Sequence, residues 1–569
     1  MIRWHCPTPP ASATALAEAL EVSPVLAGLL ASRGLREAAM AEPFLRPKLA
    51  ALDDPFRVPN LEAAAKLLDE TLAAGRTIAI FGDYDVDGVT STALLVNVLR
   101  AFGAQPRFAV PRRLEEGYGL SRAAIDRVLA DGAPDLFIAL DCGTNAIAEV
   151  ALLRERGCQV IIVDHHKPKG GVPLDSLLIN PHADATAGAP WSQLCTVGLV
   201  FKLTHGLVKL RRAANDPRAA ALRLADTLDL VALGTVADLV PLEGENRILA
   251  RHGMRILEKC ARPGLRALFA VSGLQPGQTL AASDISYRLG PRINASGRLA
   301  DAALPVELLL DDQPDSCRRA AMTLETLNRE RQNIERQVAA EAERLVEETQ
   351  RDAPALVVYG ETWHPGVVGI VAGKLCRQYA RPCIVLGREG PLAKGSGRSI
   401  PGLNLVEALQ PCAEFLAHWG GHPMAVGISL DAARLTDFHA AFSESVRTRR
   451  AALIEDSTDL EIAAWLEPAD LNEDLLRDLE LLHPYGEGNP EPVFGVRGVR
   501  LTSPEIFGGS NYRCWVPNGK SRVAAVAWKK AGELPPAQTP LDLAAKFSWN
   551  FWNGRQYPQL EILHWRAAE

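Results

Sequence analysis

Three short apolar runs in the first third of the chain each end directly at acidic side chains. The runs are RTIAIF at 76–81 before the loop GDYDVDG, DLFIAL at 135–140 before Asp141, and QVIIV at 159–163 before Asp164. Apolar residues recur at helical spacing over 89–102, directly after the first loop. Strands that alternate with helices predict an α/β fold with a doubly wound parallel sheet, in which ligands bind at the carboxyl ends of strands. We therefore expect these polar clusters to lie at one edge of a sheet.

The composition is that of a folded, multidomain protein. The chain has 569 residues, of which 47% are hydrophobic and 23% charged, and its mean hydropathy is +0.00. These values exclude a largely disordered, collagen-like or coiled-coil chain, and the length corresponds to several domains of ~150 residues. No run of ~18 apolar residues and no secretory signal is visible, so we expect a cytoplasmic protein that does not contact a membrane.

Cysteine spacing and net charge exclude two further classes of site. The ten cysteines form no Cys-x-x-Cys pair, which argues against a disulfide framework and against structural zinc. With 61 Lys and Arg against 68 Asp and Glu, the net charge is -7. Any binding of a polyanion must therefore come from local basic surface.

The remainder of the chain divides into four further parts. An N-terminal extension covers 1–60 and the sheet domain described above 61–312. A charged stretch nearly free of Gly and Pro predicts a long connector helix at 313–352, which either packs on one domain or links two lobes. Strand-like runs at 354–359 and 382–386 predict a second α/β domain over 353–455.

The last segment, 456–569, is rich in turns and short apolar alternations and predicts a small OB-like β-barrel. Its final 69 residues hold ten aromatic residues and eight Lys or Arg against five acids. Such a mixture suits a surface that stacks bases and neutralises phosphates, although the rings could equally fill the core of a barrel.

The acidic and imidazole clusters have the composition of a metal centre. Asp83, Asp85 and Asp87 alternate along the first loop, so on extended backbone their carboxylates lie on one side. Taken alone, this loop could equally be an acidic turn or a calcium loop. Asp141, the triplet Asp164-His165-His166 and Asp238 in GTVADLVPL add further donors. Carboxylates with imidazole favour manganese or magnesium over zinc.

These motifs carry a resemblance to a known family. DYDVDG, DCG, DHH and GTVAD, in this order, resemble the signature motifs of the DHH phosphoesterase superfamily. PRINASGRL from Pro291, GSGRS from Gly395, WGGH ending at His422 and HPYGEGNPEPVF from His483 extend the resemblance. The whole set is similar to the bacterial single-strand-specific exonucleases of this superfamily over nearly the full length. By this resemblance, 61–312 is a DHH domain and 353–455 a DHH-associated domain.

The resemblance implies a centre of two divalent ions, Mn²⁺ or Mg²⁺. Its implied ligands are Asp85, Asp87, Asp141, His165 and Asp238, with Asp141 bridging both ions. Asp83 would join the first ion or orient its neighbours, because Phe81 stands where the superfamily often has histidine.

Catalytic roles are implied for three residues. Asp141 would hold both ions, Asp164 would fix the tautomer of an imidazole, and His166 would face the scissile phosphate.

Candidate substrate-binding residues lie in the later motifs. Arg298, Ser396 and Arg398 match positions that hold a terminal 5′-phosphate in the family, and arginine meets phosphate oxygens bidentately. His422 would line the cleft from the second domain. Asn294 and Arg292 are further candidates, for which capping or packing is the equal alternative. A 5′ end held at a fixed distance from the metals implies stepwise 5′→3′ release of mononucleotides.

The expected function is therefore that of a metal-dependent 5′→3′ exonuclease for single-stranded DNA in recombination and repair. By resemblance, its partners would be a single-strand-binding protein and a repair helicase, and we expect a monomer. One alternative is a DHH phosphodiesterase for short oligonucleotides or cyclic dinucleotides. The other is an inactive DHH-fold replication scaffold, which should have lost the metal-binding residues that this chain retains.

Overall fold

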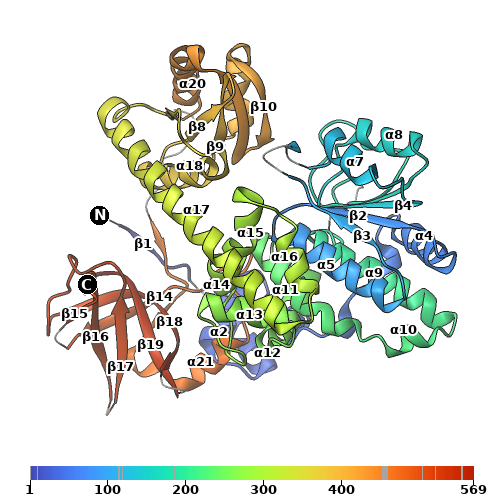
Figure 1. Cartoon of the computed structure of the whole chain (residues 1–569). Coiled ribbons are helices and arrows are strands. Elements are labelled where there is room, and N and C mark those ends of the chain that lie inside the picture. The colour runs from blue at the N-terminus through green and yellow to red at the C-terminus, as the bar shows by residue number, and fades with distance from the viewer. Residues whose placement is uncertain are drawn as a thin grey trace.

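The computed structural model describes residues 2–8, 10–112, 116–117, 119–183, 188–450, 459–502, 504–519, 521–552 and 555–568. They form two α/β lobes and a β-rich C-terminal domain (Figure 1). Among these residues, no helix has both the length and the apolar character needed to cross a membrane.

The first lobe is built on a five-stranded sheet in which every pair of neighbouring strands is parallel. Its strand order is β3-β2-β4-β5-β6. The strands are β2 (Ile78–Gly82), β3 (Arg107–Ala109), β4 (Leu136–Leu140), β5 (Gln159–Val163) and β6 (Leu177–Ile179).

Helices cover both faces of this sheet, because successive side chains of each strand alternate between two cores. Ile80 and Ile138 pack in one core with α4, α5, α9 and α11, whereas Phe81 and Phe137 pack in the other with α7 and α8. The predicted doubly wound sheet is thus confirmed. The helices of the lobe are α4 (Leu61–Ala73), α5 (Val86–Ala101), α7 (Arg122–Leu129), α8 (Ile147–Glu155), α9 (Thr196–Ala213), α10 (Pro217–Ala221), α11 (Leu228–Ala237), α12 (Gly244–Lys259), α13 (Pro263–Ser272), α14 (Ala282–Asp284), α15 (Gly290–Leu299) and α16 (Leu304–Leu310).

The connector helix α17 (Pro314–Thr349) is 36 residues long and joins the two lobes (Figure 1). Near its start, Ala321 and Leu324 share a core with Leu308 of the first lobe. Near its end, Val338 and Val346 share a core with the second lobe. Of the two readings that the sequence left open, the link between lobes is the one observed.

The second lobe carries a five-stranded sheet of order β10-β11-β9-β8-β7, in which only β7 and β8 run parallel. The side chains on one sheet face pack against α17 and α18, and those on the other against α19 and α20. The elements are β7 (Leu356–Gly360), α18 (Pro365–Tyr379), β8 (Cys383–Glu389), β9 (Leu392–Arg398), α19 (Leu405–Leu409), β10 (Leu416–His422), β11 (Ala425–Asp431) and α20 (Leu435–Arg450).

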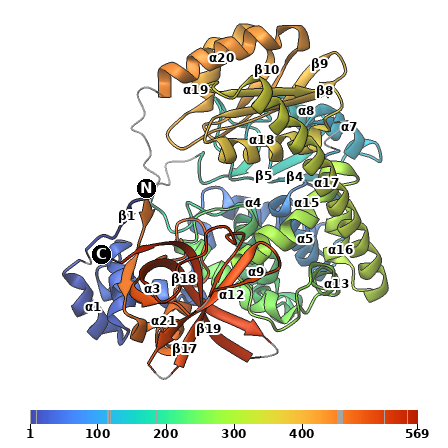
Figure 2. The same cartoon turned by 90° about the vertical axis from the view of Figure 1, so that its left-hand side faces the viewer.

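The C-terminal domain is a strongly curled seven-stranded sheet of order β13-β14-β18-β19-β17-β16-β15 (Figure 2). Its elements are β13 (Ala464–Leu466), α21 (Glu473–Glu480), β14 (Phe494–Arg500), β15 (Glu505–Phe507), β16 (Asn511–Asn518), β17 (Ser521–Ala527), β18 (Pro540–Trp552) and β19 (Arg555–Ala567). This arrangement confirms the barrel-like domain predicted from short apolar alternations.

The N-terminal segment packs on this C-terminal domain, far away in the sequence. Strand β1 (Trp4–His5) pairs in parallel with β12 (Leu460–Glu461). Helices α1 (Ser12–Leu20), α2 (Pro24–Ser32) and α3 (Ala38–Leu45) contribute Leu16, Leu26 and Leu45 to a core shared with the barrel strands. The two ends of the chain therefore form one packed unit.

A buried arginine of the first lobe ties this unit to the sheet domain. Arg247 on α12 is 2% exposed, and its guanidinium lies 3.6 Å from the ring centroid of Phe44. Its Nη2 donates to the carbonyls of Leu481, Leu482 and His483 at 3.1, 3.0 and 3.3 Å, and its Nε donates to Phe44 O at 2.6 Å. The carbonyls of Leu481, Leu482 and His483 lie just beyond the last residue of α21, at the end of a helix that attracts cations.

We predict that Arg247→Met destabilises the junction by about 2 kcal/mol or more, because several buried carbonyls lose their donor. Thermal unfolding of the full chain measures the effect. Arg255→Met is the matched control, since Arg255 is exposed on the same helix, and should change stability by less than ~0.5 kcal/mol. An Arg247→Met variant with the unfolding temperature of the wild type would contradict the proposed stabilisation by Arg247.

Candidate metal centre

The predicted polar clusters lie side by side at the carboxyl edge of the first sheet. The chain runs from β2 to β3 on one side of β2, and then from β3 to β4 on the other side. The ends of β2 and β4 therefore flank the switch point where ligands bind in such folds. Asp83, Asp141 and Asp164 each extend the hydrogen bonding of the sheet by one backbone hydrogen bond. Their amides donate to Leu140 O at 3.1 Å, Val163 O at 2.9 Å and Ile179 O at 3.1 Å, respectively.

The first acidic loop turns directly into α5. Asp85 is the N-cap of this helix, and its Oδ1 accepts from the amides of Asp87 at 3.0 Å and Gly88 at 3.2 Å. Gly88 is required by close packing, because a Cβ there would lie 2.4 Å from Asp83 O. The loop thus folds back on itself and gathers Asp83, Asp85 and Asp87.

Asp87 and Asp141 are both held by the start of α9. The Asp87 carboxylate accepts from the amides of Thr196 and Val197, each at 2.7 Å. The hydroxyl of Thr196 donates to Asp141 Oδ1 at 2.9 Å. Sequence reasoning missed Thr196, since no local pattern marks a helix start that meets acids 55 and 109 positions away.

The two adjacent histidines have different partners. His165 Nε2 lies 3.4 Å from Asp238 Oδ2, 3.6 Å from Asp141 Oδ1 and 3.9 Å from Asp87 Oδ2. His166 Nδ1 instead lies 2.8 Å from Asp164 Oδ1. His165 therefore points into the carboxylate cluster, whereas His166 is oriented by Asp164.

Asp238 reaches the cluster because α11 packs closely on α5 and α9. It directly follows the last residue of α11. A Cβ at Gly234, one turn earlier, would lie 2.4 Å from Thr90 Oγ1 and 2.7 Å from Val197 Cγ1. The glycine of the GTVAD motif thus allows the close approach that brings Asp238 to Asp87.

Burial and mutual repulsion perturb the pKa values of these groups. Burial, and next the neighbouring carboxylates, raise the pKa of Asp87 to about 7 and that of Asp238 to about 9, and also raise the pKa of Asp141 well above its ordinary value. Burial, with the charge of His166, lowers the pKa of His165 to about 4. A neutral imidazole and several crowded carboxylates together form a donor set for a divalent cation, whose charge would relieve the repulsion between the carboxylates.

Burial disfavours the charged form of His166, but the hydrogen bond and charge of Asp164 outweigh it and raise its pKa to about 9. Burial raises the pKa of Asp164, but hydrogen bonds from His166 and Thr144 outweigh burial and hold that pKa below its ordinary value. The pair therefore presents a cationic imidazole beside the cluster.

The donor atoms fall into two neighbouring groups. Asp83, Asp85 and Asp141 place one oxygen each within 4.8 Å of one another, and Asp87, His165 and Asp238 form a second such group. Asp141 also lies within this distance of both histidines, so it stands between the two groups. Phe81 has no ligand atom in its side chain; it is fully buried and stacks on Phe137 with ring centroids 6.4 Å apart.

The predicted phosphate-binding residues lie where the second lobe meets the first. Arg298, at the end of α15, donates to Gly366 O at the start of α18 at 3.0 Å. Ser396 and Arg398 lie on β9 against the same helix, since a Cβ at Gly369 would lie 3.2 Å from each of their side chains. Backbone amides at the start of a helix attract anions.

His422, at the end of β10, faces the first lobe. Burial, and next the charges of Lys169 and His166, lower its pKa. Both charges belong to the loop that carries the DHH motif, so His422 lies near enough to that loop to interact with its charges.

Two other candidates on α15 have mainly internal contacts. Arg292 Nε donates to Glu325 Oε2 of α17 at 2.7 Å, and its Nη1 donates to Arg288 O at 2.6 Å, which favours packing. The side-chain oxygen of Asn294 is buried and accepts no hydrogen bond from the described residues.

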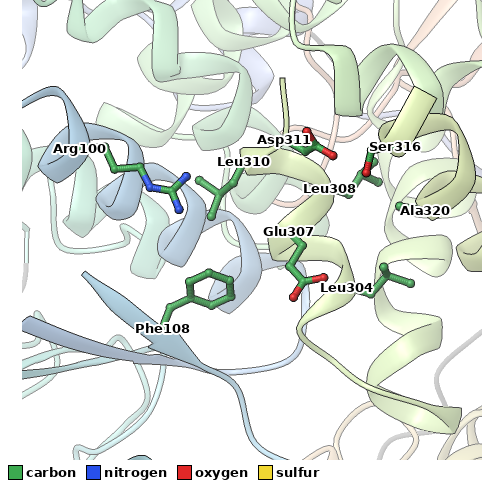
Figure 3. A pocket seen from close by; sticks show the side chains of 9 residues that line it. All are labelled: Arg100, Phe108, Leu304, Glu307, Leu308, Leu310, Asp311, Ser316 and Ala320. Carbon is green, nitrogen blue, oxygen red and sulfur yellow. The ribbon is translucent and has the colours of Figure 1, made fainter. Parts of the chain in front are cut away.

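The pocket in Figure 3 lies apart from this centre. It has a volume of about 360 Å³ between α5, β3, α16 and α17. Its lining residues are Arg100, Phe108, Leu304, Glu307, Leu308, Leu310, Asp311, Ser316 and Ala320. It shares no residue with the carboxylate cluster.

Cation binding at this centre should release protons. Asp87 and Asp238, with pKa values of about 7 and about 9, must ionise to bind a cation. We predict that Mn²⁺ affinity rises with pH from about 6 to about 9. Calorimetry in buffers of different ionisation enthalpy measures the protons released.

Without added cation, the fold should lose stability as the pH rises from about 4, the ordinary pKa of a carboxyl group, to about 9. A carboxyl pKa that is raised on folding means that the folded state binds the extra proton, and this stabilisation is lost as the pH rises through the folded pKa. Asp238→Asn should weaken both pH dependences. A Mn²⁺ affinity that does not vary with pH would contradict the proposed titration.

Comparisons with known proteins agree with this architecture. Family models match three segments: the DHH family N-terminal domain at residues 77–235, the DHHA1 domain at 352–448 and the RecJ OB domain at 462–564. The OB match confirms the predicted type of barrel.

The single-stranded-DNA-specific exonuclease RecJ of Dickeya dadantii is 37% identical, covering 98% of each chain. RecJ of Escherichia coli is 37% identical over 95% of this chain and 96% of the relative. The crystal structure of Thermus thermophilus RecJ in complex with Mn²⁺ superposes with a TM-score of 0.82 at 31% identity, covering 100% of this chain and 80% of that chain. A Mg²⁺ complex of the same enzyme gives a TM-score of 0.77 at 30% identity, with 100% and 79% coverage. The chain belongs to the RecJ family of single-stranded-DNA-specific exonucleases.

Proposed function

We propose that this chain degrades single-stranded DNA from its 5′ end and releases 5′-mononucleotides, using two Mn²⁺ or Mg²⁺ ions. The observation that carries this proposal is the pair of neighbouring donor groups that meet at Asp141. Family membership supports the substrate, and the Mn²⁺ and Mg²⁺ complexes of a relative support the ions.

The donor set fits two ions that share one ligand. Asp83, Asp85 and Asp141 would hold the first ion, and Asp87, His165, Asp238 and Asp141 the second. Bound at such a centre, two divalent ions generate a hydroxide nucleophile at neutral pH and neutralise charge on the attacking and leaving oxygens.

The protein side chains orient the substrate and supply a proton. Asp164 holds Nδ1 of His166, so the ring presents its other nitrogen, Nε2, as a donor. A cationic His166 beside the metal ligands can donate to the scissile phosphate or to the departing 3′ oxygen. Asp164 fixes the ring orientation and stabilises its charge.

The 5′→3′ direction of degradation would follow from binding of the 5′ end by the second lobe. Arg298, Ser396 and Arg398, together with the start of α18, would bind the terminal 5′-phosphate. His422 lies two strands from Arg398 at the same end of the sheet and would line the path beside them. A phosphate held there sets a fixed distance to the metal ligands, so each cut releases one nucleotide.

The barrel would hold the rest of the strand. Trp515 on β16 lies between two guanidinium groups, with Arg522 at 4.7 Å and Arg513 at 5.5 Å from its ring centroid. Trp528, Phe551 and Tyr557 are 50%, 51% and 45% exposed, whereas Tyr512 and Phe547 fill the core. Exposed rings and cations suit stacking and phosphate contact without base readout.

The two alternatives fit less well. The relatives that match this chain over nearly its full length are exonucleases rather than phosphodiesterases for short oligonucleotides. An inactive scaffold would not need a complete set of metal donors. A role in recombination and repair is consistent with the family. A single-strand-binding protein and a repair helicase as partners, a monomeric state and a cytoplasmic location stay predictions.

The proposal is tested by incubating the purified chain with Mn²⁺ and internally labelled DNA. We expect mononucleotides from single strands with a 5′-phosphate, and protection when the 5′ end is blocked. Degradation of blunt duplexes at a similar rate, protection by a 3′ block instead, or internal cutting would contradict it.

We predict that Asp141→Ala loses more than about 100-fold in activity, because outer-sphere changes alone cost ~10–100-fold. The protein should remain folded, as circular dichroism and thermal unfolding would show. Near-normal turnover would contradict the assignment of Asp141 as a metal ligand.

Arg398→Ala should raise KM for 5′-phosphorylated ends by about 10–100-fold, since a hydrogen bond to a charged group contributes ~1.5–3 kcal/mol. Ends with a 5′-hydroxyl should change little. Arg388→Ala, an exposed arginine of the neighbouring strand β8, is the control. An equal effect on both kinds of end would exclude Arg398 from phosphate binding.

A further inference from the structure

We propose that Thr196 is a positioning residue that sets the orientation of two metal ligands at once. Resting on the proposed metal centre, this inference assigns a role to a residue that belongs to none of the sequence motifs. Thr196 touches no substrate atom and acts through Asp87 and Asp141.

Two groups of Thr196 contact two different carboxylates. Its amide donates to Asp87 Oδ2 at 2.7 Å, and its hydroxyl donates to Asp141 Oδ1 at 2.9 Å. The next amide, that of Val197, donates to Asp87 Oδ1 at 2.7 Å. Asp87 lies in the loop after β2 and Asp141 follows β4, so Thr196 bridges the two strand ends that flank the switch point.

The Thr196 hydroxyl constrains the Asp141 carboxylate directly. Among the described residues, no other group donates a hydrogen bond to the Asp141 carboxylate. The backbone of Asp141 has a φ of 62°, in the left-handed region that non-glycine residues rarely adopt. The strand end thus places the residue, and the Thr196 hydroxyl fixes how its carboxylate is turned.

Thr196 itself cannot easily move. It is fully buried at the start of the 18-residue helix α9, between Cys195 and Val197, which are both fully buried. The Cys195 thiol also contacts Thr235 Oγ1 of α11 at 3.6 Å. A donor on such a rigid element can hold a carboxylate in one rotamer.

The physical consequence concerns a ligand that serves two ions. A carboxylate that would serve both ions is sensitive to its orientation, because a rotation of the group changes how its oxygens approach both ions together. One hydrogen bond to Oδ1 leaves the other lone pairs free and removes this rotation. Because the constraint precedes metal binding, its loss should appear as lower metal affinity, as for other outer-sphere donors.

The test compares three variants in the full chain, with Mn²⁺ alone as the probe. Thr196→Val keeps the shape and the amide but removes the hydroxyl, and Thr196→Ser keeps the hydroxyl. Thr204→Val is the matched control, because Thr204 is also fully buried on α9 but donates to Phe201 O at 2.9 Å. Mn²⁺ affinity is measured by calorimetry, and independently by the rise in unfolding temperature that Mn²⁺ produces.

We expect Thr196→Val to bind Mn²⁺ ~10–100-fold more weakly, while Thr196→Ser and Thr204→Val bind like the wild type. The metal-free unfolding temperatures of the two valine variants should be similar, which separates positioning from a general loss of fold. With DNA present, Thr196→Val should need correspondingly more Mn²⁺ for half-maximal activity.

Unchanged Mn²⁺ affinity in Thr196→Val would overturn the inference while leaving the proposed exonuclease intact. An equal loss in Thr204→Val, or no recovery in Thr196→Ser, would also overturn it. A wild-type chain that binds no Mn²⁺ would overturn the proposed metal centre and this inference together.

Discussion

The cluster of carboxylates at the carboxyl edge of the first sheet is the constraint that the surrounding elements must satisfy. Asp87 and Asp141 are buried and the Asp238 side chain is 21% exposed, and burial together with mutual repulsion raises the pKa of each. A fold accepts such a cluster only if nearby donors or cations compensate it. The amides at the start of α9, the neutral His165 and the close approach of α11 at Gly234 provide the scaffold, and divalent cations provide the charge.

In the proposed function, the second lobe adds the binding of the 5′ end to this metal centre. The connector helix α17 has its start in a core of the first lobe and its end in a core of the second. Arg298 extends from the first lobe to the start of α18, and His422 faces back toward the DHH loop. The proposed phosphate-binding residues and the proposed metal ligands therefore lie on two lobes that one 36-residue helix connects.

Much of this architecture follows from local sequence patterns. Apolar runs that end at acids predict parallel strands, and the carboxyl edge of a parallel sheet brings Asp83, Asp141 and Asp164 together. The charged stretch without Gly or Pro likewise predicts α17. By contrast, Thr196 and Arg247 contact groups far away in the sequence, so no local sequence pattern marks either residue. For the same reason, the pairing of β1 with β12 could not be predicted, because it depends on packing between the two ends of the chain.

Anomalous diffraction from crystals of the chain soaked in Mn²⁺ would locate the bound ions. We expect two manganese peaks ~3.5–4 Å apart, one beside Asp83 and Asp85, the other beside Asp87, His165 and Asp238, with Asp141 between them. A single peak, or peaks outside these two donor groups, would contradict the proposed metal centre.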